Sequence, residues 1–288
     1  MILLPRKEKC KAYFELMRLN KPIGSLLLLW PTLWALWIAA KGVPDISVLF
    51  VFSCGVFLMR STGCVINDFA DRNIDGSVAR TKNRPLPSGR VSAKEALILF
   101  FILSSVSLFL VLTQNTLTIK LSFIGLLLAF FYPFSKRFTP LPQLFLGLAF
   151  SWSIPMAYAA QTGRLDTVVW LLFIINIIWT IAYDTLYAMV DKEDDLKIGV
   201  KSSAILFAPY ERVIVAILQL ISCALLLLLG FFENLTLIYF ISLCFVLGLF
   251  IKQHWDMRKN EKDAYFQAFL NNNKIGAVIF IALFLTYL

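Results

Sequence analysis

Two short acidic stretches hold the residues with the clearest chemical content, and together they contain eight of the 18 acidic residues. The first stretch follows Asn67 and includes Asp68, Asp71 and Asp75. These three aspartates are spaced i, i+3 and i+7, so a helix that continues through them places all three on one face. Carboxylates stacked this closely repel one another, and a bound divalent cation relieves that repulsion.

The second acidic stretch has a matching pattern. Asp184, Asp191 and Asp195 are spaced i, i+7 and i+11, which again is one face of a helix. Mg²⁺ in proteins is commonly held by one or two carboxylates together with phosphate oxygens of a substrate. Two such faces opposite each other predict a Mg²⁺-dependent clamp for a diphosphate.

Basic residues that suit phosphate oxygens follow each acidic stretch or lie between the two. A Pro- and Gly-containing segment, 84–90, predicts an ordered loop near the first stretch that could act as a lid. The candidate phosphate ligands are Arg72, Arg80, Lys82, Arg84, Lys136, Arg137, Lys197 and Lys201.

The composition shows which kind of element must position these groups. Of 288 residues, 59% are apolar and 16% are charged, against about 45–50% and about 25% in soluble domains. The mean hydropathy of +0.76 points the same way. This excludes a disordered chain and a basic nucleic-acid-binding domain, and it predicts an all-helical polytopic membrane protein. Five cysteines without paired spacing and a single histidine, His254, predict neither a disulfide framework nor a zinc, haem or copper site.

Nine apolar runs are long enough to predict transmembrane helices, although eight spans remain possible because the last two runs are short. The first run follows a basic leader, 1–22, and predicts an uncleaved first span. The chain is therefore expected to form one integral-membrane domain over 1–288, with active-site loops at 68–94 and 191–211. The predicted spans are 23–40, 47–67, 95–113, 117–134, 141–160, 167–190, 212–231, 235–251 and 275–288.

Most of the 27 lysines and arginines fall in the leader and in alternate loops, which predicts a cytoplasmic N-terminus. Both acidic stretches then lie at the cytoplasmic membrane face. Arg60 is the one basic residue in the interior of a predicted span, away from its first and last turns, and it lies on the helical face of Asn67 and Asp71. Because an arginine at that depth must pair with an anion, one interpretation is that it seats a substrate carboxylate bidentately. The alternative is that it extends to the interface or pairs with a structural carboxylate.

Three motifs give the chain a family resemblance. Asn67, Asp68, Asp71 and Asp75 match the pattern Asn-Asp-x-x-Asp-x-x-x-Asp, and residues 191–195 match Asp-x-x-x-Asp. Tyr132 with Lys136 matches Tyr-x-x-x-Lys. The sequence thereby resembles the UbiA superfamily of intramembrane aromatic prenyltransferases over the leader to about residue 207, and beyond that only hydropathy matches. The resemblance is strongest to its bacterial branch that prenylates 4-hydroxybenzoate in ubiquinone biosynthesis, and it is carried by segments 16–24, 29–35, 63–68, 83–89 and 184–202.

The resemblance implies a bundle of about nine spans around a central polar cavity open to the cytoplasm, in a bacterial inner membrane. It implies Mg²⁺, a polyprenyl diphosphate donor, an aromatic acceptor and surrounding lipid, with no nucleic acid. The metal ligands would be Asp68, Asp71, Asp75, Asp191 and Asp195, with Asp71, Asp75, Asp191 and Arg137 essential for catalysis. The substrates would contact Arg18, Asn20, Arg60, Asn67, Arg72, Arg80, Lys82, Arg84, Tyr132, Lys136, Lys197 and Lys201.

Three other functions fit part of the pattern. A CDP-alcohol phosphotransferase would explain Asp75-Gly76 and Arg80, but Ala93 and Leu97 stand where its last two aspartates belong. A transporter of an anionic lipid or metabolite would also use membrane carboxylates, although nearer the midplane. A prenyltransferase of the same superfamily with a naphthoate, homogentisate or haem acceptor differs only in the aromatic substrate.

Overall fold

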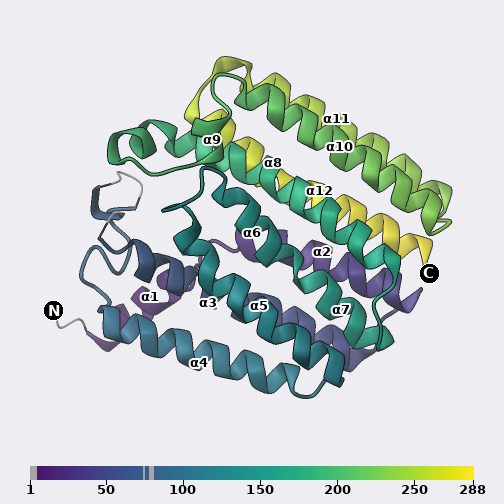
Figure 1. Ribbon diagram of the computed structural model, residues 1–288, viewed down its shortest axis with the longest axis horizontal. Helices are drawn as coiled ribbons and strands as arrows, with labels where there is room; N and C mark the ends of the chain where they lie inside the picture. The colour runs from purple at the N-terminus through teal and green to yellow at the C-terminus, as the bar shows by residue number, and fades with distance from the viewer. Residues whose placement is uncertain (1–4, 74, 78–80) are drawn as a thin grey trace.

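The computed structural model describes residues 5–73, 75–77 and 81–288, and all of its regular elements are helices (Figure 1). The helices are α1 Arg6–Leu16, α2 Ile23–Ala40, α3 Ile46–Asp71, α4 Ala93–Val111, α5 Thr116–Ser135, α6 Pro142–Ser151, α7 Ser153–Thr162, α8 Thr167–Ile198, α9 Ser203–Leu206, α10 Glu211–Phe232, α11 Leu237–Asp256 and α12 Lys262–Thr286, with 3₁₀ turns η1 Asp75–Ser77 and η2 Met257–Lys259.

Eight of these helices are long and apolar enough to cross a bilayer, which confirms a multi-pass membrane protein. The span predicted at 141–160 differs, because it is divided into α6 and α7 at Trp152. Pro155 accounts for the break, since it offers no N–H to the carbonyl of Ser151 and its ring crowds that carbonyl. The final predicted span, 275–288, is also longer than expected, because α12 begins at Lys262.

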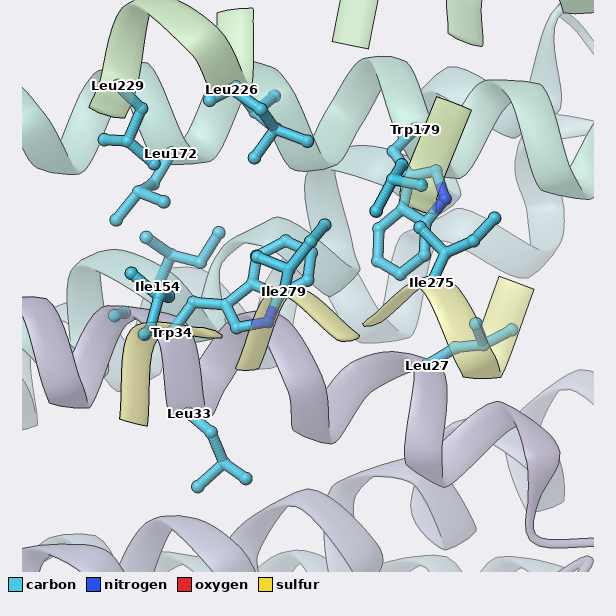
Figure 2. Close-up of a cluster of buried hydrophobic side chains, with 14 of the residues drawn as sticks. Leu27, Leu33, Trp34, Ile154, Leu172, Trp179, Leu226, Leu229, Ile275 and Ile279 are labelled. Carbon is cyan, nitrogen blue, oxygen red and sulfur yellow. The ribbon is translucent and has the colours of Figure 1, made fainter. Parts of the chain in front are cut away.

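The main core lies where α2, α7, α8, α10 and α12 meet (Figure 2), and it continues onto α11. The Trp34 and Trp179 rings stack there with centroids 5.4 Å apart. Each indole N–H is satisfied inside the core: Trp34 donates to the carbonyl of Gly276 at 3.1 Å, and Trp179 donates to the side chain of Asn272 at 2.9 Å. These contacts hold α2 and α8 against α12, the last helix of the chain.

The outer helices are arranged differently. Helices α10 and α11 lie together along one edge of the bundle, and α4 lies along the opposite edge (Figure 1). All three expose large apolar side chains, including Phe101, Phe109, Leu220, Phe231 and Phe245. In a membrane, lipid covers these exposed apolar side chains at both edges of the bundle. The polar residues are instead gathered inside the bundle and at its ends.

Candidate active site

A cavity of about 640 Å³ lies at the end of the bundle that carries α1 and α9 (left in Figure 1). Its walls come from α1, α2, α3, α5, α6, α8 and α12 and from the segments around residues 18–21, 81–85 and 198–202. All five aspartates predicted as metal ligands line it, together with Asp184. The structure thus brings the two acidic stretches to one space, although they are more than 100 residues apart in sequence.

Helix α8 carries the second acidic stretch. It runs for 32 residues, or about 48 Å at 1.5 Å per residue, so it is longer than the roughly 30 Å hydrocarbon layer. Its last turns, with Asp191 and Asp195, therefore extend the helix beyond the apolar span. Residues 191–198, predicted as part of a loop, are helical. Gly199 then ends the helix in the left-handed conformation (φ 70°), and the chain turns back along the cavity.

The first acidic stretch is not one continuous helical face. Helix α3 ends at Asp71, and Asp75 lies in the 3₁₀ turn η1. The predicted i, i+3, i+7 helix was therefore wrong for Asp75. Arg84 brings this residue back to the others, because its Nη1 donates to Asp75 Oδ2 at 2.9 Å and to Asp68 Oδ1 at 3.1 Å. Burial raises the pKa of the Asp75 carboxyl above its ordinary value despite the opposing Arg84 charge.

Asp71 has a carboxylate oxygen that is suited to accept a cation. Asp71 is buried, with 2% of the residue exposed, and Lys136 forms an ion pair with its Oδ2. Within the described part of the chain, its Oδ1 has no hydrogen-bond partner. A buried carboxylate oxygen without a partner is rare and indicates a missing ligand, water or ion. A divalent cation is a fitting partner, because oxygen donors are what Mg²⁺ binds.

The described residues contain no preformed cluster of three or more His, Cys, Asp or Glu side chains close enough to hold a metal. Instead, the aspartates on the α3 side are paired with basic residues. Arg18 donates to both oxygens of Asp68 at 2.8 Å, while Lys136 pairs with Asp71. The mutual repulsion expected from the spacing is therefore offset by cations of the chain itself.

The predicted substrate-binding residues divide into two groups. Those that line the cavity are Arg18, Asn20, Arg60, Asn67, Arg84, Tyr132, Lys136 and Lys201. Arg72, Lys82 and Lys197 are not among the described lining residues, and Arg80 lies outside the described part of the chain. Arg137, predicted as a catalytic residue, is not among the described lining residues either. Lys82 and Lys197 are exposed, and Lys197 approaches Asp194 at 3.8 Å.

Arg72 and Arg137 both bind the end of α3 rather than the cavity. Arg72 donates to the carbonyl of Phe69 at 2.7 Å and lies over the Phe69 ring. Arg137 donates to the carbonyl of Ala70 at 2.8 Å and lies over the ring of Phe134. Arg137 thus contacts the residue next to Asp71, so its geometry favours positioning of that carboxylate over direct contact with substrate.

Several residues that line the cavity were not predicted as site residues. Asp184 was placed on the predicted acidic face with Asp191 and Asp195 but was left out of the predicted metal ligands, and it lines the cavity with them. Phe266 and Phe269 of α12 also line the wall. They were missed because Lys262 and Asp263 lower the hydropathy there, although 266 and 269 have helical i, i+3 spacing.

A second cavity, of about 240 Å³ and mostly apolar, lies alongside the first. Arg60 and Tyr132 line both cavities, so they mark where the two meet. The guanidinium of Arg60 lies over the ring of Phe150, 5.4 Å from its centroid. Tyr132 donates weakly to Asn67 at 3.5 Å. A polar chamber that meets an apolar one suits a ligand with a charged head and a hydrocarbon tail.

Comparisons with known proteins point to one family over nearly the whole length of the chain. A profile of the UbiA prenyltransferase family matches residues 28–284. The chain is 71% identical over 282 residues to a 4-hydroxybenzoate octaprenyltransferase of Psychromonas ingrahamii, covering 98% of both chains. It is 61% identical over 279 residues to one of Vibrio atlanticus, covering 97% of this chain and 98% of the relative.

Two solved structures share the arrangement of helices. The apo structure of a UbiA homolog from Aeropyrum pernix K1 has a TM-score of 0.80 at 23% identity, covering 91% of this chain and 98% of that one. A UbiA homolog from Archaeoglobus fulgidus bound to GPP and Mg²⁺ has a TM-score of 0.76 at 15% identity, covering 96% and 99%. At these identities the similarity shows a common fold.

Proposed function

Because the chain belongs to the UbiA prenyltransferase family, we propose that it transfers a polyprenyl group from polyprenyl diphosphate to 4-hydroxybenzoate, at the ring carbon ortho to the hydroxyl. The family match confirms the resemblance seen in its three motifs. The observation that carries the proposal is the meeting of both acidic stretches with Arg18, Arg84 and Lys136 in one cavity. The names of the relatives support this acceptor and an octaprenyl donor in ubiquinone biosynthesis.

The metal is proposed to be Mg²⁺, held by Asp71 and Asp75 on one wall and by Asp191 and Asp195 on α8. The Archaeoglobus fulgidus relative, which binds GPP and Mg²⁺, supports a divalent ion with a prenyl diphosphate. When bound, such ions offset the negative charge that develops on a departing diphosphate. The buried Oδ1 of Asp71, which has no hydrogen-bond partner among the described residues, supports the choice of Asp71 as a metal ligand.

The chain's own cations are proposed to bind the diphosphate from the sides. Lys136 pairs with Asp71, and Arg84 with Asp68 and Asp75, so each is already held at the cavity wall. Phosphate oxygens of the donor can take the place of, or share, these carboxylate contacts. Charge-assisted hydrogen bonds from fixed donors favour the leaving group most when its charge is fully developed.

The isoprenoid tail is proposed to enter the apolar cavity, whose walls include Leu28, Phe52, Val56 and Phe150. Arg60, at the junction of the two cavities, is proposed to bind the carboxylate of the acceptor. The C–O bond of the donor then breaks to give an allylic cation and diphosphate. The ring carbon next to the hydroxyl attacks the cation, and loss of its proton restores aromaticity.

The protein is proposed to lie in a bacterial inner membrane as one integral-membrane domain with a cytoplasmic N-terminus. The basic helix α1 and the loops around 81–92 and 199–210 are at the cavity end of the bundle (Figure 1). The positive-inside rule supports a cytoplasmic position for that end.

The direct test uses membranes that contain the full chain. Labelled 4-hydroxybenzoate and a polyprenyl diphosphate are supplied with Mg²⁺, with EDTA, or with EDTA followed by excess Mg²⁺. Prenylated 4-hydroxybenzoate should form only when Mg²⁺ is present. Preferential labelling of dihydroxynaphthoate in a parallel reaction would assign another acceptor within the family, and transfer to neither compound would overturn the proposal.

A further inference from the structure

Asp68 differs from Asp71, its neighbour on α3, in how its carboxylate oxygens are used. Its side chain is 1% exposed, and Arg18 Nη2 lies 2.8 Å from both Oδ1 and Oδ2. Arg84 Nη1 also approaches Oδ1, at 3.1 Å. Both carboxylate oxygens are therefore engaged by guanidinium groups, whereas Asp71 keeps one oxygen without a described partner.

The turns that carry Arg18 and Arg84 hold both guanidinium groups beside Asp68. Arg18 has a left-handed conformation (φ 58°) in the turn between α1 and α2, which is uncommon for a residue other than glycine. Its Nη1 donates to the carbonyl of Glu15 at 2.9 Å, so the guanidinium is held on two sides. Arg84 comes from a separate turn, closed by its own N–H to the carbonyl of Thr81 at 2.9 Å.

The charges explain why one carboxylate is placed between two arginines. Two guanidinium groups at the wall of one cavity repel each other, and a buried anion between them offsets that repulsion. One aspartate leaves the trio with a net positive charge, so the arrangement still favours an anionic ligand. Binding Mg²⁺ at Asp68 would instead require breaking charge-assisted hydrogen bonds, which are among the strongest in proteins.

We propose that Asp68 is a positioning residue that holds Arg18 and Arg84 as a diphosphate-binding pair, and that it is not a metal ligand. This revises the role predicted for Asp68 from its spacing, and it rests on the proposed function. Asp68 would act on donor affinity through the two arginines, while Asp71 acts on the metal directly.

The experiment compares Asp68→Asn with Asp71→Asn, two substitutions of equal size on adjacent turns of α3. The first readout is Mn²⁺ binding to the purified full chain in nanodiscs with geranyl diphosphate, followed by electron paramagnetic resonance without acceptor. The second is turnover, which gives the KM for the donor and the Mg²⁺ concentration for half-maximal rate. Thermal melting in the same nanodiscs verifies that each variant is folded.

Asp68→Asn should raise the donor KM about ten- to a hundredfold, because that factor corresponds to the loss of one charge-assisted hydrogen bond. Its Mg²⁺ requirement at saturating donor, and its Mn²⁺ signal at saturating geranyl diphosphate, should match the wild type. Asp71→Asn should weaken both metal readouts. Arg18→Gln should reproduce the Asp68→Asn effect, and the double variant Arg18→Gln/Asp68→Asn should lose little more than either single variant.

A raised Mg²⁺ requirement or a weakened Mn²⁺ signal in Asp68→Asn, under those saturating conditions, would overturn the proposal and restore Asp68 as a metal ligand. Additive losses in the double variant would also overturn it. If Asp68→Asn does not fold, Arg18→Gln decides, since an unchanged donor KM there contradicts the positioning role. If the wild type transfers no prenyl group to 4-hydroxybenzoate, the proposed function fails, while the binding measurements still decide the role of Asp68.

Discussion

The guanidinium of Arg60 occupies the space that a side chain on residue 24 would need. A Cβ placed on Gly24 would lie 2.5 Å from Arg60 Nε and 2.6 Å from its Nη2. Both residues line the larger cavity. Because the crowded atoms are the end of a long side chain, a substitution at Gly24 should move Arg60 and leave the packing of α2 largely intact.

Gly24→Ala is therefore expected to raise the KM for 4-hydroxybenzoate about tenfold, the equivalent of about 1.4 kcal/mol, with little change in the donor KM. The reason is that the methyl group displaces the guanidinium from the proposed carboxylate seat. Steady-state kinetics with each substrate varied in turn would measure both constants. Gly248→Ala is the matched control, since a Cβ there meets nothing within 4 Å. Equal changes in the KM for 4-hydroxybenzoate and the KM for the donor would contradict the proposal that Arg60 binds the carboxylate of the acceptor.

Arg60→Lys keeps the positive charge but loses the planar fork that binds a carboxylate through two hydrogen bonds. We expect a higher KM for 4-hydroxybenzoate and an almost unchanged KM for the donor. In the double variant Gly24→Ala/Arg60→Lys, the effect of Gly24→Ala should nearly vanish, because the group that it displaces has already been removed. A change in neither constant would favour a structural role for Arg60.

Asp71→Ala and Asp191→Ala each remove one carboxylate that lines the cavity, the first on α3 and the second on α8. Both should abolish detectable turnover at ordinary Mg²⁺ concentrations while the protein still inserts into membranes, which immunoblotting of membrane fractions would verify. Asp194→Ala is the control on α8, because Asp194 is not among the described lining residues and pairs only distantly with Lys197. Near-normal turnover in either site variant would remove the basis of the two-walled metal site.

Arg137→Ala should raise the Mg²⁺ concentration needed for half-maximal rate as well as lowering kcat. The lost hydrogen bond to the carbonyl of Ala70 holds the end of α3 beside Asp71. Arg72→Ala is the comparison, because it removes an exposed arginine that bonds one residue earlier, at Phe69. A kcat loss in Arg137→Ala with an unchanged Mg²⁺ requirement would point to direct contact with substrate instead.

Spacing predicted the site best where a helix continued without interruption. Asp184, Asp191 and Asp195 share one cavity because α8 extends to Ile198. The same reasoning was wrong at Asp75, where α3 ends four residues earlier and a long-range contact from Arg84 replaces the helix. Ion pairs between distant segments leave no periodic pattern, so sequence could not assign Arg84 or Arg18 to particular carboxylates.

The tryptophans of the first span show a second limit of the sequence. Segment 29–35 was taken to favour a 4-hydroxybenzoate acceptor, yet none of its residues lines the larger cavity. Trp30 donates to Asn273 at 2.7 Å, and Trp34 packs on Trp179. The segment therefore contributes to how α2 packs against α8 and α12. A motif shared by relatives can report a common packing arrangement as readily as a common substrate.

Helices α10 and α11 contribute no described residue to either cavity, although together they form much of one edge of the bundle. Selection on this hairpin should act on membrane insertion, on its buried core residues such as Leu226 and Leu229, and on the polar contacts of Gln219 with Gln253 and His254. Its lipid-facing positions are then free to exchange one apolar residue for another over evolutionary time. A saturation mutagenesis library should accordingly tolerate Leu, Ile, Val, Phe and Met interchangeably at Leu220 or Phe245, whereas Asp71 and Asp191 should accept almost no replacement.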